Sequence, residues 1–112
     1  QVNGRLTLDG NIADVSGIKY TYKAYKVAFK PTEYRISGIN FTHDQLFFIG
    51  YTQGYCTKMR PGQTSTTLKG GGSIALPTHR IFGTLSNFPD FSKAFKCSDK
   101  KIMNPLERCA LW

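Results

Sequence analysis

The longest helical pattern in the chain covers residues 12–30, which read IADVSGIKYTYKAYKVAFK. Apolar side chains recur there at steps of three and four residues, which places them on one face of a helix. We predict a helix from Ile12 to about Lys30, which the following proline ends because proline lacks an N–H donor. Its cap is Asp9 or Asn11, both of which suit that position. The predicted buried stripe consists of Val15, Ile18, Tyr22, Tyr25 and Phe29.

A second helix is predicted from His43 to about Arg60. Thr42 is a suitable N-cap, and Gln45, three residues further on, completes a capping box. This segment is apolar nearly all round, so we expect it to be buried in a body larger than this chain supplies.

The second half of the chain contains more loops. Residues 69–73 form a glycine-rich loop, and residues 80–85 suit a short extended segment. A short helix is predicted to begin at residues 87–90, with Pro89 in its first turn. Phe88, Phe91 and Phe95 would share the inner face of that helix, and residues 97–112 are irregular. The predicted fold class is mainly α, with loops and little strand.

Length and charge restrict the possible functions. The chain has 112 residues, enough for one small domain or part of a larger one, and a formal net charge of +8. Such a charge favours anionic partners such as sulfated glycans, nucleic acid or acidic proteins. The four lysines of the first helix share one face, which is either its solvated side or a patch for phosphate or sulfate; we favour the solvated side, since lysines usually stay at the surface. These lysines are Lys19, Lys23, Lys26 and Lys30.

The cysteines and one glycosylation sequon bear on the compartment. Cys56, Cys97 and Cys109 make an odd number, so in a secreted protein at least one needs a partner outside this chain. Their spacing matches no zinc-finger pattern. The triplet Asn40-Phe41-Thr42 is a sequon for N-linked glycosylation and favours the secretory route. No apolar run is long enough to span a bilayer.

Six segments, taken in order, resemble the C-terminal part of the neprilysin family of zinc endopeptidases. Their residues in this chain are LTLDGNIAD (6–14), QLFF (45–48) with Cys56, RP (60–61), RIFGTLSN (80–87), FSKAFKC (91–97) and MNPLERC (103–109) with Trp112. Any one of these matches is weak, but the ordered set covers nearly the whole chain. The resemblance implies that residues 1–112 are the C-terminal, helical segment of a thermolysin-like peptidase domain and not a complete domain.

The resemblance also implies where a zinc site should be. Peptidases of this family bind zinc through an HExxH helix and a third, glutamate ligand that opens the ENIAD box. This chain contains no HExxH, and the glutamate position is Gly10, which has no side chain. Asp9 is adjacent, but a shift of one residue turns a side chain by about 100° around a helix. We therefore expect no zinc to be bound by this chain alone.

Three further positions carry roles in the family. Asp14 matches a carboxylate that orients a zinc-bound histidine, and Arg80 matches an arginine that holds a substrate carbonyl; Arg80 alternatively serves as a structural cation. The histidine that stabilises the oxyanion would fall on Ser73 or Ile74, so it is missing, and such a loss costs on the order of 10²- to 10³-fold in rate. His79 takes a phenylalanine position, where we expect it to stand in for a packed aromatic ring.

The favoured reading is a peptide-directed metalloendopeptidase segment that has become a pseudopeptidase. It would be extracellular, in a secreted protein or the ectodomain of a single-pass membrane protein, with a glycan on Asn40. The resemblance implies that the three cysteines form disulfides with upstream partners. The expected partners are the upstream part of the domain and peptides, and nucleic acid is not expected. The alternatives are part of an active metallopeptidase, or a basic extracellular module that binds glycans or other anions.

Overall fold

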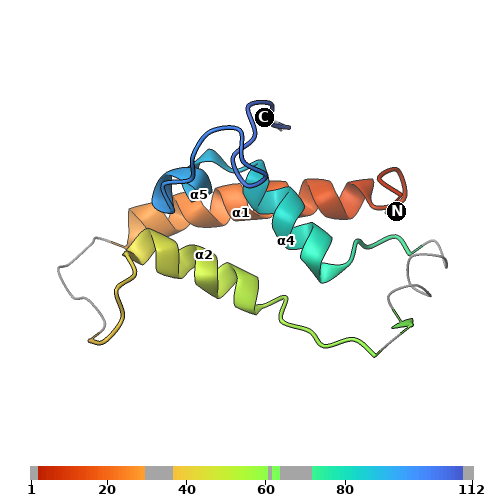
Figure 1. The fold of residues 1–112 in the computed structure, drawn as a ribbon, viewed down its shortest axis with the longest axis horizontal. Helices are drawn as coiled ribbons and strands as arrows, with labels where there is room; N and C mark the ends of the chain where they lie inside the picture. Colours follow the sequence, from red (N-terminus) through yellow and green to blue (C-terminus); the bar gives the residue numbers. More distant parts are fainter. Residues whose placement is uncertain (1–2, 30–36, 61, 64–71, 110–112) are drawn as a thin grey trace.

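The computed structural model describes residues 3–29, 37–60, 62–63 and 72–109. Within them the chain is mainly α, as predicted (Figure 1). The helices are α1 (Leu8–Ala28), α2 (His43–Gln53), α4 (Pro77–Ser86) and α5 (Pro89–Ala94). In the same residues the extended pairing consists of one isolated bridge between Lys101 and Asn104. None of the described helices is both long and apolar enough to cross a bilayer.

Helix α1 begins earlier than the sequence predicted. Its N-cap is Thr7, and the first helical hydrogen bond runs from the N–H of Asn11 to the carbonyl of Thr7 at 2.9 Å. The Thr7 hydroxyl is buried, donates to the carbonyl of Asn3 at 3.2 Å and accepts from the Asn11 side chain at 3.1 Å. The prediction of Asp9 or Asn11 as the cap was therefore wrong, because a turn fixed by Thr7 lets the helix start at Leu8. The helix ends at Ala28, and Lys30 and Pro31 lie outside the described residues.

Helix α2 confirms its predicted start and corrects its predicted end. The Thr42 hydroxyl accepts from the N–H of Gln45 at 3.2 Å, and the N–H of Thr42 donates to the Gln45 side chain at 2.9 Å. This is the predicted capping box. The helix ends at Gln53 and not near Arg60, because Gly54, a poor helix former, follows as its C-cap. Of its own residues only Phe48 is buried within this chain.

Helix α4 replaces the extended segment that was predicted for residues 80–85. Leu76 is extended and Pro77 takes the first helical turn, where the missing N–H has no partner to lose. Ile81 and Leu85, one turn apart, then face the core. Helix α5 confirms the short helix predicted from residue 87 onward, with Pro89 in its first turn.

The core is an aromatic cluster shared by all four of these helices. Its buried members are Ile18, Tyr22, Phe48, Leu85 and Phe88. The ring of Tyr22 in α1 stacks on that of Phe48 in α2, with centroids 5.3 Å apart, and meets Phe88 edge-on at 5.5 Å. Phe91 and Phe95 pack against the same cluster, which confirms the inner face predicted for α5. Consequently α1, α2 and the α4–α5 corner are held around one centre.

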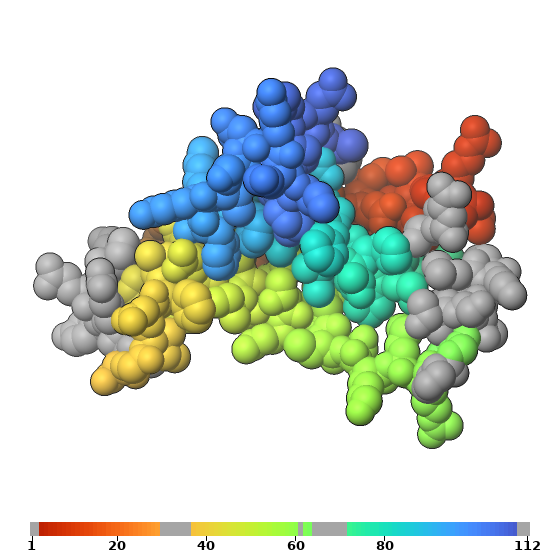
Figure 2. Space-filling view, in the orientation of Figure 1, coloured from red at the N-terminus to blue at the C-terminus, as the bar shows by residue number. Residues whose placement is uncertain are grey.

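The C-terminal segment, residues 97–109, is irregular as predicted but firmly attached. The Arg108 side chain donates to the carbonyl of Ser86 at 3.1 Å, to the hydroxyl of Ser92 at 3.2 Å and to the side chain of Asn104. The N–H of Cys109 donates to the Asn87 side chain at 2.7 Å. Figure 2 shows this segment, in dark blue, lying over the rest of the molecule. Loop backbone is thus fixed to the α4–α5 corner by side chains.

Candidate functional site

The structure brings together two of the residues singled out in the sequence, Asp14 and Arg80. Asp14 projects from the second turn of α1, and Arg80 from the first turns of α4. The Nε of Arg80 donates to Oδ2 of Asp14 at 2.7 Å, and Nη2 donates to Oδ1 at 2.6 Å. The Asp14 residue is only 8% exposed. This two-pronged pairing is the strongest form of an arginine–carboxylate contact, and it joins α1 to α4.

Two tyrosines extend the pair. The Tyr55 hydroxyl donates to Oδ1 of Asp14 at 3.4 Å, and the Arg80 guanidinium lies 5.0 Å from the centre of the Tyr55 ring. The Tyr51 hydroxyl in turn donates to that of Tyr55 at 3.4 Å. Neither tyrosine was predicted from the sequence to belong to the site. Tyr51 lies in α2 and Tyr55 just after it, and only the fold shows that Tyr55 meets Asp14.

The surroundings fix the charge states of this group. The hydrogen bond to Asp14 raises the pKa of Arg80 above its usual value, against the opposing effect of burial. Burial, with the hydrogen bond to Tyr55, raises the pKa of Tyr51. At neutral pH the guanidinium is therefore charged and the Tyr51 hydroxyl remains a proton donor.

A cavity of about 250 Å³ opens beside Asp14, between α1 and α2. Thr21, Phe47, Tyr51 and Tyr55 are among the residues that line it. Its walls combine one carboxylate, hydroxyl groups and aromatic rings. Such a cavity accommodates a single side chain and not an extended peptide.

The described residues do not fit a zinc ion. Gly10 lies in the first turn of α1, and a Cβ built on it would meet nothing within 4 Å, so the position has room for a side chain but no ligand atom. Asp9 is exposed, and both oxygens of Asp14 are bonded to Arg80. Among residues 3–29, 37–60, 62–63 and 72–109, no three His, Cys, Asp or Glu residues converge as a possible metal site.

The remaining positions implied by the resemblance lie apart from this pair. Ser73 and Ile74 are exposed in the loop before α4. His79 is also exposed within this chain, so its expected place in a packed aromatic position stays a prediction for the whole domain. His43, by contrast, packs on Phe29, with ring centroids 4.9 Å apart.

The cysteines are unpaired within the chain. Cys56 and Cys109 are exposed and Cys97 is partly buried, and all three are free thiols. The implied disulfides to upstream partners remain a prediction. Asn40 of the sequon is exposed, two residues before the cap of α2.

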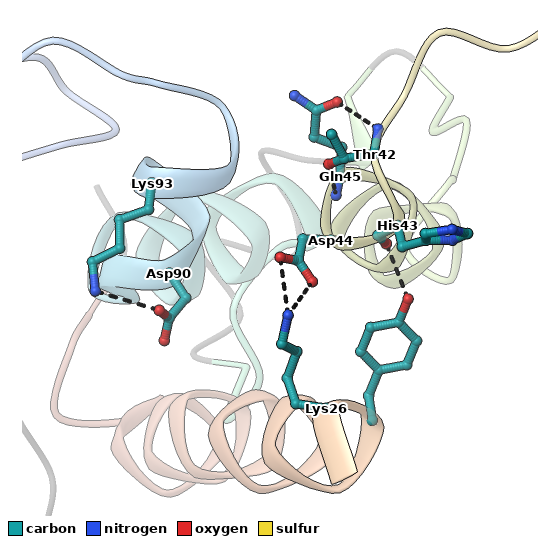
Figure 3. A network of polar contacts seen from close by, with 8 residues as sticks. Lys26, Thr42, His43, Asp44, Gln45, Asp90 and Lys93 are labelled. Carbon is teal, nitrogen blue, oxygen red and sulfur yellow. Dashed lines mark hydrogen bonds and ion pairs between the residues drawn. The ribbon is translucent and has the colours of Figure 1, made fainter. Parts of the chain in front are cut away.

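One lysine of α1, Lys26, and one lysine of α5, Lys93, are paired with carboxylates. Nζ of Lys26 lies 3.0 Å from a carboxylate oxygen of Asp44, and Nζ of Lys93 lies 3.6 Å from Asp90 (Figure 3). These four residues and Lys23 line an open groove of about 710 Å³. Because two of its three lysines are paired, the groove carries little net positive charge. Lys30 lies outside the described residues.

Comparison of the sequence with known proteins shows the family of this chain. The sequence model of peptidase family M13 matches residues 1–111. Neprilysin-2 of Caenorhabditis elegans is 41% identical over 100% of this chain, and membrane metallo-endopeptidase-like 1 of Mus musculus is 41% identical over 99% of it. Endothelin-converting enzyme-like 1 of Homo sapiens is 39% identical over 100% of the chain. The chain spans 15% of the length of each of these three relatives. It belongs to peptidase family M13, as a segment of a neprilysin-like metallopeptidase domain.

Proposed function

We propose that this chain is the C-terminal part of a peptide-directed metalloendopeptidase domain that has lost catalysis. The observation that carries the proposal is Gly10. Where the family resemblance requires a glutamate to hold zinc, Gly10 offers open space and no side-chain oxygen. A zinc ion held elsewhere in the domain would lack this ligand, and its affinity would fall accordingly.

Peptide binding is the function that the remaining site supports. Nε and Nη2 of Arg80 are held by Asp14, and the side chain is 29% exposed. Its Nη1 has no hydrogen-bond partner among the described residues, so it can donate to a peptide carbonyl. Asp14 keeps the guanidinium charged and oriented, and the partial exposure of the Arg80 side chain leaves it accessible. A pseudopeptidase built in this way would capture peptides without cleaving them.

The proposal also concerns zinc and the upstream part of the domain, which would supply the other zinc ligands. When bound, zinc would polarise the scissile carbonyl and activate a water molecule. Within residues 1–112, Asp14 would orient a neighbouring group and Arg80 would hold substrate, but neither is free to be a ligand. The odd number of thiols and the sequon support an extracellular location, in a secreted protein or an ectodomain.

The test uses the protein that carries this chain together with its upstream residues. We expect it to retain no stoichiometric zinc after dialysis and to cleave no model peptide, while it still binds peptides. A Gly10→Glu variant is expected to recover zinc, if the upstream histidines are present. Gly50→Glu is the matched control, because a Cβ at Gly50 also meets nothing within 4 Å but lies on α2.

One result would support the competing view that the protein is an active metallopeptidase. If the unaltered protein holds about one zinc and cleaves peptides, and Asp9→Asn abolishes both, then Asp9 supplies the missing ligand. Asp9 is acidic, exposed and adjacent to Gly10, so this variant is the direct discriminator. Peptide binding that survives Arg80→Ala unchanged would count against the proposed binding role.

A further inference from the structure

The sequon of this chain overlaps the start of a helix. Asn40 is exposed and belongs to no helix or strand, and two residues later Thr42 is the N-cap of α2. Asn3, Asn11, Asn87 and Asn104 are not followed by Ser or Thr at the required position, so the 112 residues contain one sequon. Because Asn40 is exposed and is the one sequon asparagine in these residues, a glycan found on them can be assigned to it.

In the folded chain, Thr42 of the sequon already forms two hydrogen bonds. Its hydroxyl accepts the hydrogen bond from the N–H of Gln45, and its own N–H donates to the Gln45 side chain. Figure 3 shows Thr42 and Gln45 linked in both directions. The Nε2 of Gln45 also donates to the carbonyl of Ala94 at 2.9 Å, which ties this corner to the end of α5.

The transfer reaction needs the same hydroxyl. A glycosyltransferase of the secretory route forms a bond from Nδ2 of Asn40 to the anomeric carbon of an oligosaccharide donor. The bond from that carbon to the lipid diphosphate breaks, the diphosphate leaves with the electron pair, and the amide proton passes to a base of the transferase. The hydroxyl two residues after the asparagine is what makes the triplet an acceptor, so it must face the enzyme.

We propose that Asn40 is an N-glycan acceptor and that the glycan is attached before α2 forms its capping box. Once Thr42 is bound to Gln45, and Gln45 to α5, the hydroxyl is withdrawn from the transferase. Asn40 itself remains exposed, so a glycan already in place is compatible with the folded chain. The half-exposed Ile39 and Phe41 beside it would lie under the sugar and be shielded from solvent. The proposal rests on the proposed secretory route.

Two variants at one position separate glycan acceptance from helix capping. Thr42→Ser keeps both the sequon and a capping hydroxyl, whereas Thr42→Asp keeps a capping oxygen but destroys the sequon. When the protein is expressed through the secretory route, we expect glycan-releasing amidase to remove a glycan from the proteolytic peptide that contains residue 40, in the original and in Thr42→Ser. In Thr42→Asp and Asn40→Gln that peptide should carry no glycan, and the amidase should not change its mass. A glycan that persists on this peptide in Asn40→Gln would overturn the site.

The order of events is tested with purified components. A peptide of residues 37–45 and the folded protein are each incubated with a purified oligosaccharyltransferase and a lipid-linked donor. We expect the peptide to be modified at least tenfold faster, and Gln45→Ala, which loosens the cap, to narrow that difference. Equal rates for peptide and folded protein would refute the proposed order, and a peptide that is never modified would refute the acceptor.

This second experiment also separates the inference from the proposed location. It supplies enzyme and donor directly, so it does not depend on where the protein resides. Rapid modification of the peptide, combined with a protein that carries no glycan in its own cells, would support the acceptor chemistry and count against the secretory route.

Discussion

Asp14 is a buried carboxylate that depends on the residues bonded to it. Its carboxylate is almost fully buried, and a buried carboxylate is stable only when its oxygens are bonded. In this chain Arg80 and Tyr55 meet that requirement. The sequence could identify both Asp14 and Arg80 through the family resemblance. It could not show that they bond to each other, because they lie 66 positions apart and only the packing of α4 on α1 joins them.

Asp14→Asn should lower the free energy of unfolding by about 2–3 kcal/mol, because it leaves a partly buried guanidinium without its counter-charge. Urea denaturation followed by circular dichroism measures this loss. Asp90→Asn is the control, since the pair of Asp90 with Lys93 is exposed and 3.6 Å long. It should change the free energy by less than about 0.5 kcal/mol. Equal effects of the two variants would contradict the structural role of the Asp14 pair.

Gly10→Glu should stabilise the chain by about 1 kcal/mol, whether or not zinc is present. A helical glycine is replaced by a better helix former, and the new carboxylate lies in the first turn, where the helix dipole favours it. Gly38→Glu should have the opposite effect, because Gly38 has a φ of 81° that a side chain strains. Thermal melting of the two variants compares these effects directly.

At the scale of elements, the helix termini decide which predictions succeeded. The starts of α2 and α5 were predicted because their signals are local: Thr42 with Gln45, and Pro89 in a first turn. Helix α4 was missed because its residues carry no capping side chain and its proline was not taken as a start. The end of α2 was placed too late because its apolar pattern continues through Tyr55, which packs against Asp14 from outside the helix.

Thr42→Ala should cost about 1 kcal/mol of stability, because the N–H of Gln45 then loses its acceptor. Thr42→Asp should stay close to the original, since an aspartate side chain accepts the same hydrogen bond. Chemical denaturation of protein produced without glycans gives both values. A Thr42→Asp variant as unstable as Thr42→Ala would show that the hydroxyl is not acting as a cap.

At the scale of the whole molecule, the aromatic core makes the chain sensitive to alkali. Burial, reinforced by the negative charge of Asp44, raises the pKa of Tyr22 to about 12 from its usual value of 10.0. Burial likewise raises the pKa of Tyr51 and of Tyr25. The folded chain therefore keeps protons that the unfolded chain releases above pH 10.

The free energy of unfolding should consequently be constant with respect to these tyrosines below pH 10. It should fall as the pH rises from 10 to about 12, by roughly 1.4 kcal/mol per pH unit for each protonated tyrosine. Absorbance of tyrosinate together with circular dichroism follows the titration and the unfolding. Tyr22→Phe should reduce the rate at which the free energy of unfolding falls with pH above pH 10. Tyrosine titration completed near pH 10 with the fold intact would contradict the proposed burial effect.

Large apolar side chains on the surface predict how the chain behaves alone. Leu8, Phe82, Ile102 and Leu106 are each about half exposed or more, and Ile102 is 86% exposed. With three free thiols, the isolated chain should associate and form mixed disulfides. Size-exclusion chromatography and thiol titration check this. A monodisperse monomer with three titratable thiols would argue that the chain needs no covering partner.

The hydrogen bonds of the single side chain Arg108 make the order of the α4–α5 corner depend on one residue. Its guanidinium donates to the end of α4, to α5 and to the loop at Asn104, so one side chain holds these three places together. A chain that ends at Glu107 would lose the hydrogen bonds of Arg108 and also the one from Cys109 to Asn87. Stepwise truncation from the carboxyl end would therefore have a sudden effect: the α4–α5 corner would lose its order at the step that removes Arg108.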